Sequence, residues 1–82
     1  MSMHLTEGKL PVVNMKKTGE NITRMRKAAG VSVRELQTVL GLTTPQAIYG
    51  WQKGSYLPTI DNLIILAAVL DVTVDDLIST TS

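Results

Sequence analysis

The sequence predicts an all-α fold, a compact domain of five short helices. Glycine, proline and helix-capping residues divide residues 20–78 into five segments, and apolar residues recur at helical spacing along them. Neither residue content nor an alternating pattern indicates a central strand. The 82 residues suffice for one core, and because the chain has no cysteine, that core must hold without disulfides.

Capping and stop motifs define the first two predicted helices. The first covers residues 20–29, where apolar side chains recur at i, i+3 and i+7, and Gly30 follows as a C-terminal stop. The second follows Ser32, which forms a capping-box pattern with Glu35 three residues later. We expect this helix to end seven or eight residues on, before Gly41.

Threonines mark the starts of the other three helices. The third begins at the Thr-Pro pair of residues 44–45, because proline suits a first helical position, and it continues to Lys53 before Gly54. The fourth covers residues 59–70 and the fifth residues 73–78, each with a threonine N-cap. Helices this short are marginal alone and must share a core. The predicted core is Ile22, Met25, Leu36, Leu40, Ile48, Trp51, Leu57, Ile60, Leu63, Leu66, Ala67, Leu70, Val72 and Leu77.

Charge is distributed unevenly along the chain. All eight Lys and Arg residues lie within residues 9–53 together with two Glu, which gives +6, whereas residues 54–82 carry four Asp and no cation. Such asymmetry predicts one positive surface for a polyanion and one more acidic, apolar surface for something else; a chance spread of surface charge is the alternative.

Several function classes find no support in the residues. The only histidine, His4, lies in the N-terminal arm as a solvated bystander, and there is no Ser–His–Asp set, phosphate-binding glycine loop or metal cluster, so we predict no enzyme, cofactor, metal or small-molecule ligand. The longest apolar run, "LIILAAVL", is far shorter than the roughly 18 residues of a membrane span, and no export signal is present. We expect a cytoplasmic protein.

The order of these motifs resembles the Cro and repressor-type (XRE) helix-turn-helix DNA-binding domains. The resemblance covers residues 18–78 and depends on "NITRMRKAAGVSVRELQTVLGL" and "IYGWQKGSYLPTIDNLIILAAVLDVTVDDLI". It implies a lambda-repressor-like fold and a bacterial or phage transcription regulator, a repressor that binds a palindromic operator in double-stranded DNA as a homodimer, with the third helix in the major groove. The alternative is a protein-interaction module, such as an antitoxin or partner subunit.

Base reading is assigned to the start of the third helix. Gln46 is the main candidate, because a glutamine amide can hydrogen-bond adenine at two atoms at once; the alternative is a solvated side chain that merely favours the helix. Thr44 contacts DNA or only caps the helix. Tyr49 follows the inward Ile48, so its ring faces outward toward the sugar-phosphate backbone or a thymine methyl, or is an ordinary half-buried tyrosine.

Phosphate contacts are assigned to cations and free backbone N–H groups. The two lysines before the first helix would follow a groove edge as a flexible arm. The predicted contacts are Arg34, Lys53, Ser55, Tyr56, Lys16 and Lys17.

Three positions depart from the family pattern. Arg26 usually pairs with an acidic residue that is here Gln52, so either an Arg–amide hydrogen bond joins the two helices or the arginine is free for phosphate. The turn before the third helix is one residue longer than usual, which would accommodate Gln37 in place of a small residue. Gly50 replaces a long polar residue and would let the backbone approach the duplex or leave a base pair unread.

An apolar stripe on the fourth helix predicts a covered surface. Ile65, Ala68 and Val72 face away from the core stripe, so either a second subunit or the arm segment "LPVV" covers them, and we predict a homodimer. The predicted segments are an N-terminal arm, the helix-turn-helix domain and a tail: residues 1–17, 18–79 and 80–82.

Overall fold

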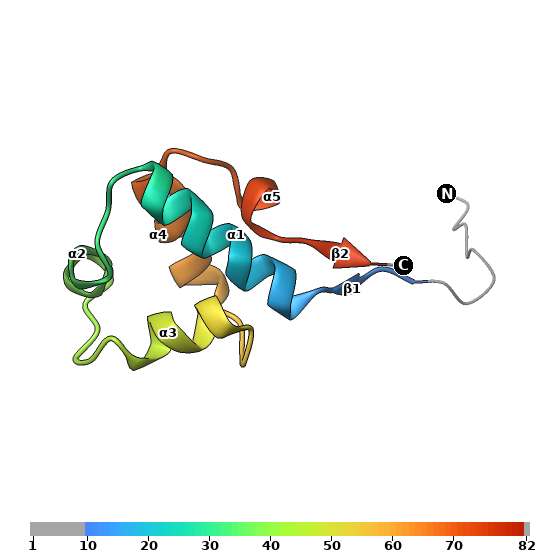
Figure 1. Cartoon of the computed structure of the whole chain (residues 1–82), viewed down its shortest axis with the longest axis horizontal. Coiled ribbons are helices and arrows are strands. Elements are labelled where there is room, and N and C mark those ends of the chain that lie inside the picture. Colours follow the sequence, from blue (N-terminus) through green and yellow to red (C-terminus); the bar gives the residue numbers. More distant parts are fainter. Residues whose placement is uncertain (1–9, 82) are drawn as a thin grey trace.

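The computed structural model describes residues 10–81, and these contain the five predicted helices (Figure 1). His4, Lys9 and the first nine residues of the predicted arm lie outside the described residues. The all-α fold class is confirmed, with a short pair of strands added near the chain ends. In chain order the elements are β1 (Val12–Val13), α1 (Met15–Ala28), α2 (Val33–Val39), α3 (Gln46–Lys53), α4 (Ile60–Leu70), α5 (Val74–Leu77) and β2 (Thr80–Thr81).

The first helix begins five residues earlier than the predicted Glu20. Asn14 caps it, because the Asn14 Oδ1 accepts a hydrogen bond from the Lys17 N–H at 2.9 Å. The prediction followed apolar periodicity, and the first turn of α1 is mostly polar. Lys16 and Lys17 are therefore helical, and the prediction that they precede the helix as a flexible arm is wrong.

The core lies where α1, α3, α4 and α5 meet, with α2 at one end of the molecule (Figure 1). Two predicted core residues are wrong: Ile60 is 76% exposed and Leu57 is 40% exposed. Ile60 begins α4 and Leu57 lies in the loop before it. Both line an apolar hollow of about 170 Å³ together with Val13, and no further element of residues 10–81 covers them. The buried apolar side chains are Ile22, Leu36, Ile48, Trp51, Leu66, Ala67, Leu70 and Leu77.

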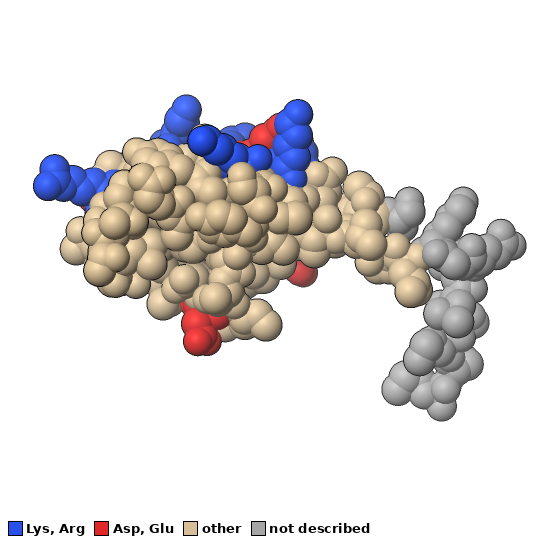
Figure 2. All heavy atoms as spheres, turned by 90° about the horizontal axis from the view of Figure 1, so that it is seen from below, with Lys and Arg blue, Asp and Glu red and all other residues tan. Residues whose placement is uncertain are grey.

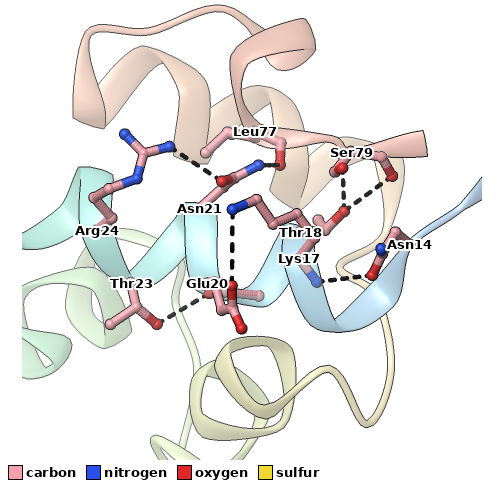
Figure 3. Close-up of polar contacts among 10 residues, drawn as sticks. Asn14, Lys17, Thr18, Glu20, Asn21, Thr23, Arg24, Leu77 and Ser79 are labelled. Atoms are coloured by element: carbon pink, nitrogen blue, oxygen red, sulfur yellow. Dashed lines mark hydrogen bonds and ion pairs between the residues drawn. The ribbon is translucent and has the colours of Figure 1, made fainter. Parts of the chain in front are cut away.

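Polar side chains of α1 hold the C-terminal segment (Figure 3). The buried Asn21 donates from Nδ2 to the Leu77 carbonyl at 3.1 Å, and the buried Thr18 Oγ1 accepts from the Ser79 N–H at 3.0 Å. The Asn14 N–H donates to the Ser79 carbonyl at 2.8 Å, and β1 continues this contact by pairing antiparallel with β2. Residues about 60 positions apart are thereby joined along one side of α1.

Two glycines bring the backbones of α1 and α3 into direct contact. A Cβ on Gly19 would meet the Trp51 carbonyl oxygen and would lie 2.6 Å from the Gln52 carbonyl oxygen. A Cβ on Gly54 would lie 2.7 Å from Lys16 Cα, and Gly54 also has a φ of 77°, which favours glycine. This glycine contact fixes α3 on the bundle. Gly19 was not among the predicted packing residues, because it lies just before the predicted start of the first helix.

Candidate nucleic-acid interface

The capping box of α2 forms as predicted. The Ser32 Oγ accepts from the Glu35 N–H at 3.0 Å, and the Glu35 carboxylate accepts from the Ser32 N–H at 3.0 Å. These two bonds fix the first turn of α2, which presents the exposed Arg34. Leu36, fully buried on the opposite side, holds the helix to the core.

The capping box makes stability depend on pH. Hydrogen bonds from the Ser32 N–H, and to a smaller extent from its hydroxyl, lower the pKa of Glu35 below its ordinary 4.5. Because the folded pKa is depressed, the stabilisation is complete above about pH 4.5 and is lost as the pH falls below it. We expect Glu35→Gln to lower the Tm at pH 7, with the difference from wild type shrinking at pH 3, as measured by thermal circular dichroism.

Glu20→Gln on α1 is the matched control, because it removes one exposed carboxylate that takes part in no capping bond. A Tm difference for Glu35→Gln that is equal at both pH values would contradict the role of the carboxylate charge.

Helix α3 has an anchored side and an exposed side. Ile48 is fully buried and Trp51 nearly so, whereas Gln46, Tyr49 and Lys53 are exposed. The first intrahelical bond joins the Tyr49 N–H to the Pro45 carbonyl, so α3 begins at Gln46, one residue later than predicted. Thr44 Oγ1 accepts from the Gln46 N–H at a long 3.4 Å, but Pro45 is the N-cap of α3, and no side chain caps the helix.

Gly50 is buried, and its neighbour is a tyrosine from the loop after α3. A Cβ on Gly50 would collide with the Tyr56 ring, and the Tyr56 hydroxyl donates to the Gln46 carbonyl at 3.3 Å. The ring therefore occupies the space where a side chain of residue 50 would lie. The prediction that Gly50 opens the backbone to the duplex is wrong, and the Tyr56 hydroxyl is bound to α3.

Helices α2 and α3 are separated by a shallow groove of about 320 Å³. Its lining includes Arg34 and Gln37 from α2, Pro45 from the turn, and Tyr49 from α3. Gln37 is half-buried in this groove. It lies between α2 and α3, in the space that the longer turn was expected to leave for it. The groove brings Arg34 and Tyr49 to one surface, although they lie on different helices.

The cations lie along one edge of the surface that Figure 2 shows, with acidic side chains mostly on the opposite edge. The close approach of Gly54 to the Lys16 backbone brings the first turn of α1 beside the end of α3, where Lys53 and Ser55 are exposed. Lys17 Nζ lies 3.9 Å from Glu20 Oε2, an exposed ion pair of little energetic weight. The predicted phosphate-binding residues thus gather at two places, the start of α2 and the junction of α1 with α3.

Arg24 and Lys27 are exposed cations that the sequence analysis did not assign. They share one face of α1 with Lys17 and line a shallow hollow of about 420 Å³ with Gln52. Helical spacing from Lys17 would place both residues on the same face, but only if the helix is taken to begin at Met15.

Arg26 joins three parts of the domain. Its Nε donates to Gln52 Oε1 at 2.9 Å, and its Nη1 donates to the Val31 carbonyl at 2.9 Å. The guanidinium thus links α1 to α3 and to the segment before α2 by way of a neutral amide rather than an ion pair.

Within residues 10–81, His, Cys, Asp and Glu side chains form no group of three that could hold a metal ion. No helix in this part of the chain is long and apolar enough to cross a membrane.

Comparisons with known proteins give the family. A helix-turn-helix family model matches residues 22–77, and no curated protein matches the chain. A structure of the biofilm master regulator SinR in complex with DNA is 31% identical, with a TM-score of 0.64, over 73% of this chain and 95% of that one. The restriction-modification controller C.AhdI from Aeromonas hydrophila is 26% identical over 78% and 96% of the two chains, with a TM-score of 0.69.

The gene regulator ClgR from C. glutamicum has the same fold, with a TM-score of 0.67 at 21% identity over 77% of this chain and 80% of that one. The family match covers the four helices from α2 to α5 and the second half of α1, including the exposed side of α3. The chain therefore belongs to the helix-turn-helix family, as an XRE-type DNA-binding regulator.

Proposed function

We propose that the protein is a repressor that binds a palindromic operator as a homodimer, with α3 in the major groove. The exposed side of α3 carries this proposal: Ile48 and Trp51 fix the helix from within, and Gln46 and Tyr49 project from its outer side. Gln46 reads adenine through its amide, and Thr44 and Tyr49 contact the flanking positions. The SinR structure, which holds DNA, supports this use of the fold.

Sequence-independent affinity comes from the two cationic places beside α3. Arg34 at the start of α2 holds phosphate on one side, and cations at the junction of α1 with α3 hold it on the other. Beside the edge that carries the cations, Figure 2 shows a broad uncharged surface, which suits contact with base edges rather than phosphates. The Ser55 N–H is bound to the Gly50 carbonyl, so only the Ser55 hydroxyl is available for a phosphate. The proposed phosphate contacts are Arg34, Lys53, Lys16 and Lys17, with the Ser55 hydroxyl and the Tyr56 backbone N–H.

The exposed face of α4 is the proposed dimer surface. Ile64 is 56% exposed and Ile65 is 38% exposed, and Ala68 lies beside them. Val72 is half-buried against the core and contributes only its outer part. The segment proposed as an alternative cover pairs with the C-terminal strand, since Val12 and Val13 lie opposite Thr81 and Thr80. A twofold dimer would present two α3 helices to half-sites about 34 Å apart.

A DNA-binding domain can repress transcription simply by occupying the operator. We propose that the protein does so in the cytoplasm. Selection of binding sites from random duplex DNA tests the proposal. Enrichment of one inverted repeat, bound by two chains, is the expected result. Absence of any enriched sequence, with binding to a protein partner instead, would support the antitoxin or partner-subunit function and overturn this one.

A further inference from the structure

Helix α3 has a glycine, Gly50, in the middle of the strip that the proposed function directs toward DNA. Gln46, Gly50 and Lys53 follow one another at i, i+4 and i+7, so they lie along one strip of the helix. Gln46 and Lys53 are exposed, yet Gly50 between them is buried. What buries it is the ring of Tyr56, six residues later in the chain.

The loop after α3 holds this ring in place. The Gly54 N–H donates to the Trp51 carbonyl at 3.1 Å, and the Ser55 N–H donates to the Gly50 carbonyl at 2.9 Å. These bonds turn the chain back along the helix, and the Tyr56 hydroxyl then reaches the Gln46 carbonyl at 3.3 Å. The ring is consequently aligned with the strip that connects Gln46 to Lys53.

The ring is in contact with α3 and still open to solvent. Tyr56 is 47% exposed, whereas its hydroxyl is occupied by the Gln46 carbonyl. The hydroxyl end of the side chain also packs against Gly50, so the exposed part offered to a ligand is mainly the apolar ring. In the major groove the apolar group presented by a base is the thymine methyl.

We propose that Tyr56 supplies the base-reading side chain that α3 lacks at position 50, and that its ring contacts a thymine methyl beside the base pair read by Gln46. The assignment depends on the proposed placement of α3 in the major groove. Gly50 has a definite role in it: the absence of a side chain at position 50 is what admits the ring. Removing the ring at position 56, or adding a side chain at position 50, should then abolish the same contact.

Operators in which single thymines are replaced by deoxyuridine test the methyl contact directly. The wild type should lose about fourfold in affinity at one thymine next to the Gln46-dependent base pair, since one buried methyl-sized group is worth about that factor. Tyr56→Phe, which keeps the ring, should show the same loss. Tyr56→Ala and Gly50→Ala should bind the thymine and deoxyuridine operators equally.

The double variant Gly50→Ala/Tyr56→Ala should discriminate no differently from either single variant, because both remove one shared contact. Thermal circular dichroism of each variant establishes that it is folded, and Gly50→Ala carries the test if Tyr56→Ala does not fold. Three results would overturn the inference. All variants could respond equally to deoxyuridine, or Tyr56→Ala could lose the same affinity for every operator. The selected operator could also have no thymine beside the Gln46-dependent pair.

These results are distinct from failure of the proposed function. If no operator is selected, or if no base-pair preference depends on Gln46, the proposed function fails and this inference fails with it. If the operator and its Gln46-dependent pair are found without a Tyr56-dependent thymine, only the inference is overturned.

Discussion

Gly19→Ala is expected to lower the stability of the domain, although alanine is the better helix former. The added methyl would collide with the Trp51 and Gln52 carbonyl oxygens, which belong to the backbone of α3 and cannot rotate away. Overpacking of this kind costs about 1–3 kcal/mol or more, against a helix-propensity gain of about 1 kcal/mol. We therefore expect a net loss of up to about 2 kcal/mol in the free energy of unfolding, measured by urea denaturation.

Gly50→Ala is the matched control, because it makes the same change inside another helix. The atoms nearest to a Cβ at Gly50 belong to the exposed Tyr56 side chain, which can swing outward, whereas those at Gly19 belong to backbone. Gly50→Ala should therefore be the more stable of the two. A Gly19→Ala variant as stable as the wild type would show that α1 and α3 can separate without cost.

Gln46→Ala and Arg34→Ala are expected to weaken DNA binding in different ways. Removing the Gln46 amide should cost about 1–3 kcal/mol at one base pair of the selected operator, and its preference for adenine there should disappear. Removing Arg34 should weaken all duplexes alike and reduce the slope of log affinity against log salt by about one. Fluorescence anisotropy titrations on operator and random duplexes at several salt concentrations measure both effects.

Glu35→Gln serves as a control for position, since it alters the first turn of α2 beside Arg34 without removing a cation. It should leave the salt slope unchanged. If Gln46→Ala and Arg34→Ala reduce binding to all sequences by the same factor, the division between base reading and phosphate binding is incorrect.

Local sequence signals predicted the helices well because each helix is defined by residues close together in the chain. The Ser32–Glu35 box and the Gly54 stop are formed within three or four residues, and both lie where they were predicted. The inward direction of Ile48 and Trp51 also follows from helical spacing alone.

Apart from the start of α1, where a local asparagine cap was missed, the errors concern contacts that only the folded chain creates. Ile60 has the spacing of a core residue, but it lies beyond the helices that would cover it. The meeting of Tyr56 with Gly50, and of Gly19 with Gln52, depends on how a loop and two helices are packed. Helical periodicity gives no information about such neighbours. The missing side chain at Gly50 was therefore interpreted as room for DNA, whereas the Tyr56 ring occupies that space.

The polar contacts between α1 and the C-terminal segment bear on how the domain reaches its native state. Bonds such as Asn21 to Leu77 close a loop of more than 50 residues, and the entropy of closing it must be lost before the contact returns any stability. The contacts of α1 with α3 are nearer in sequence and should form first. Mutations at Asn21 are thus expected to accelerate unfolding with little effect on the folding rate, whereas mutations at Gly19 should slow folding.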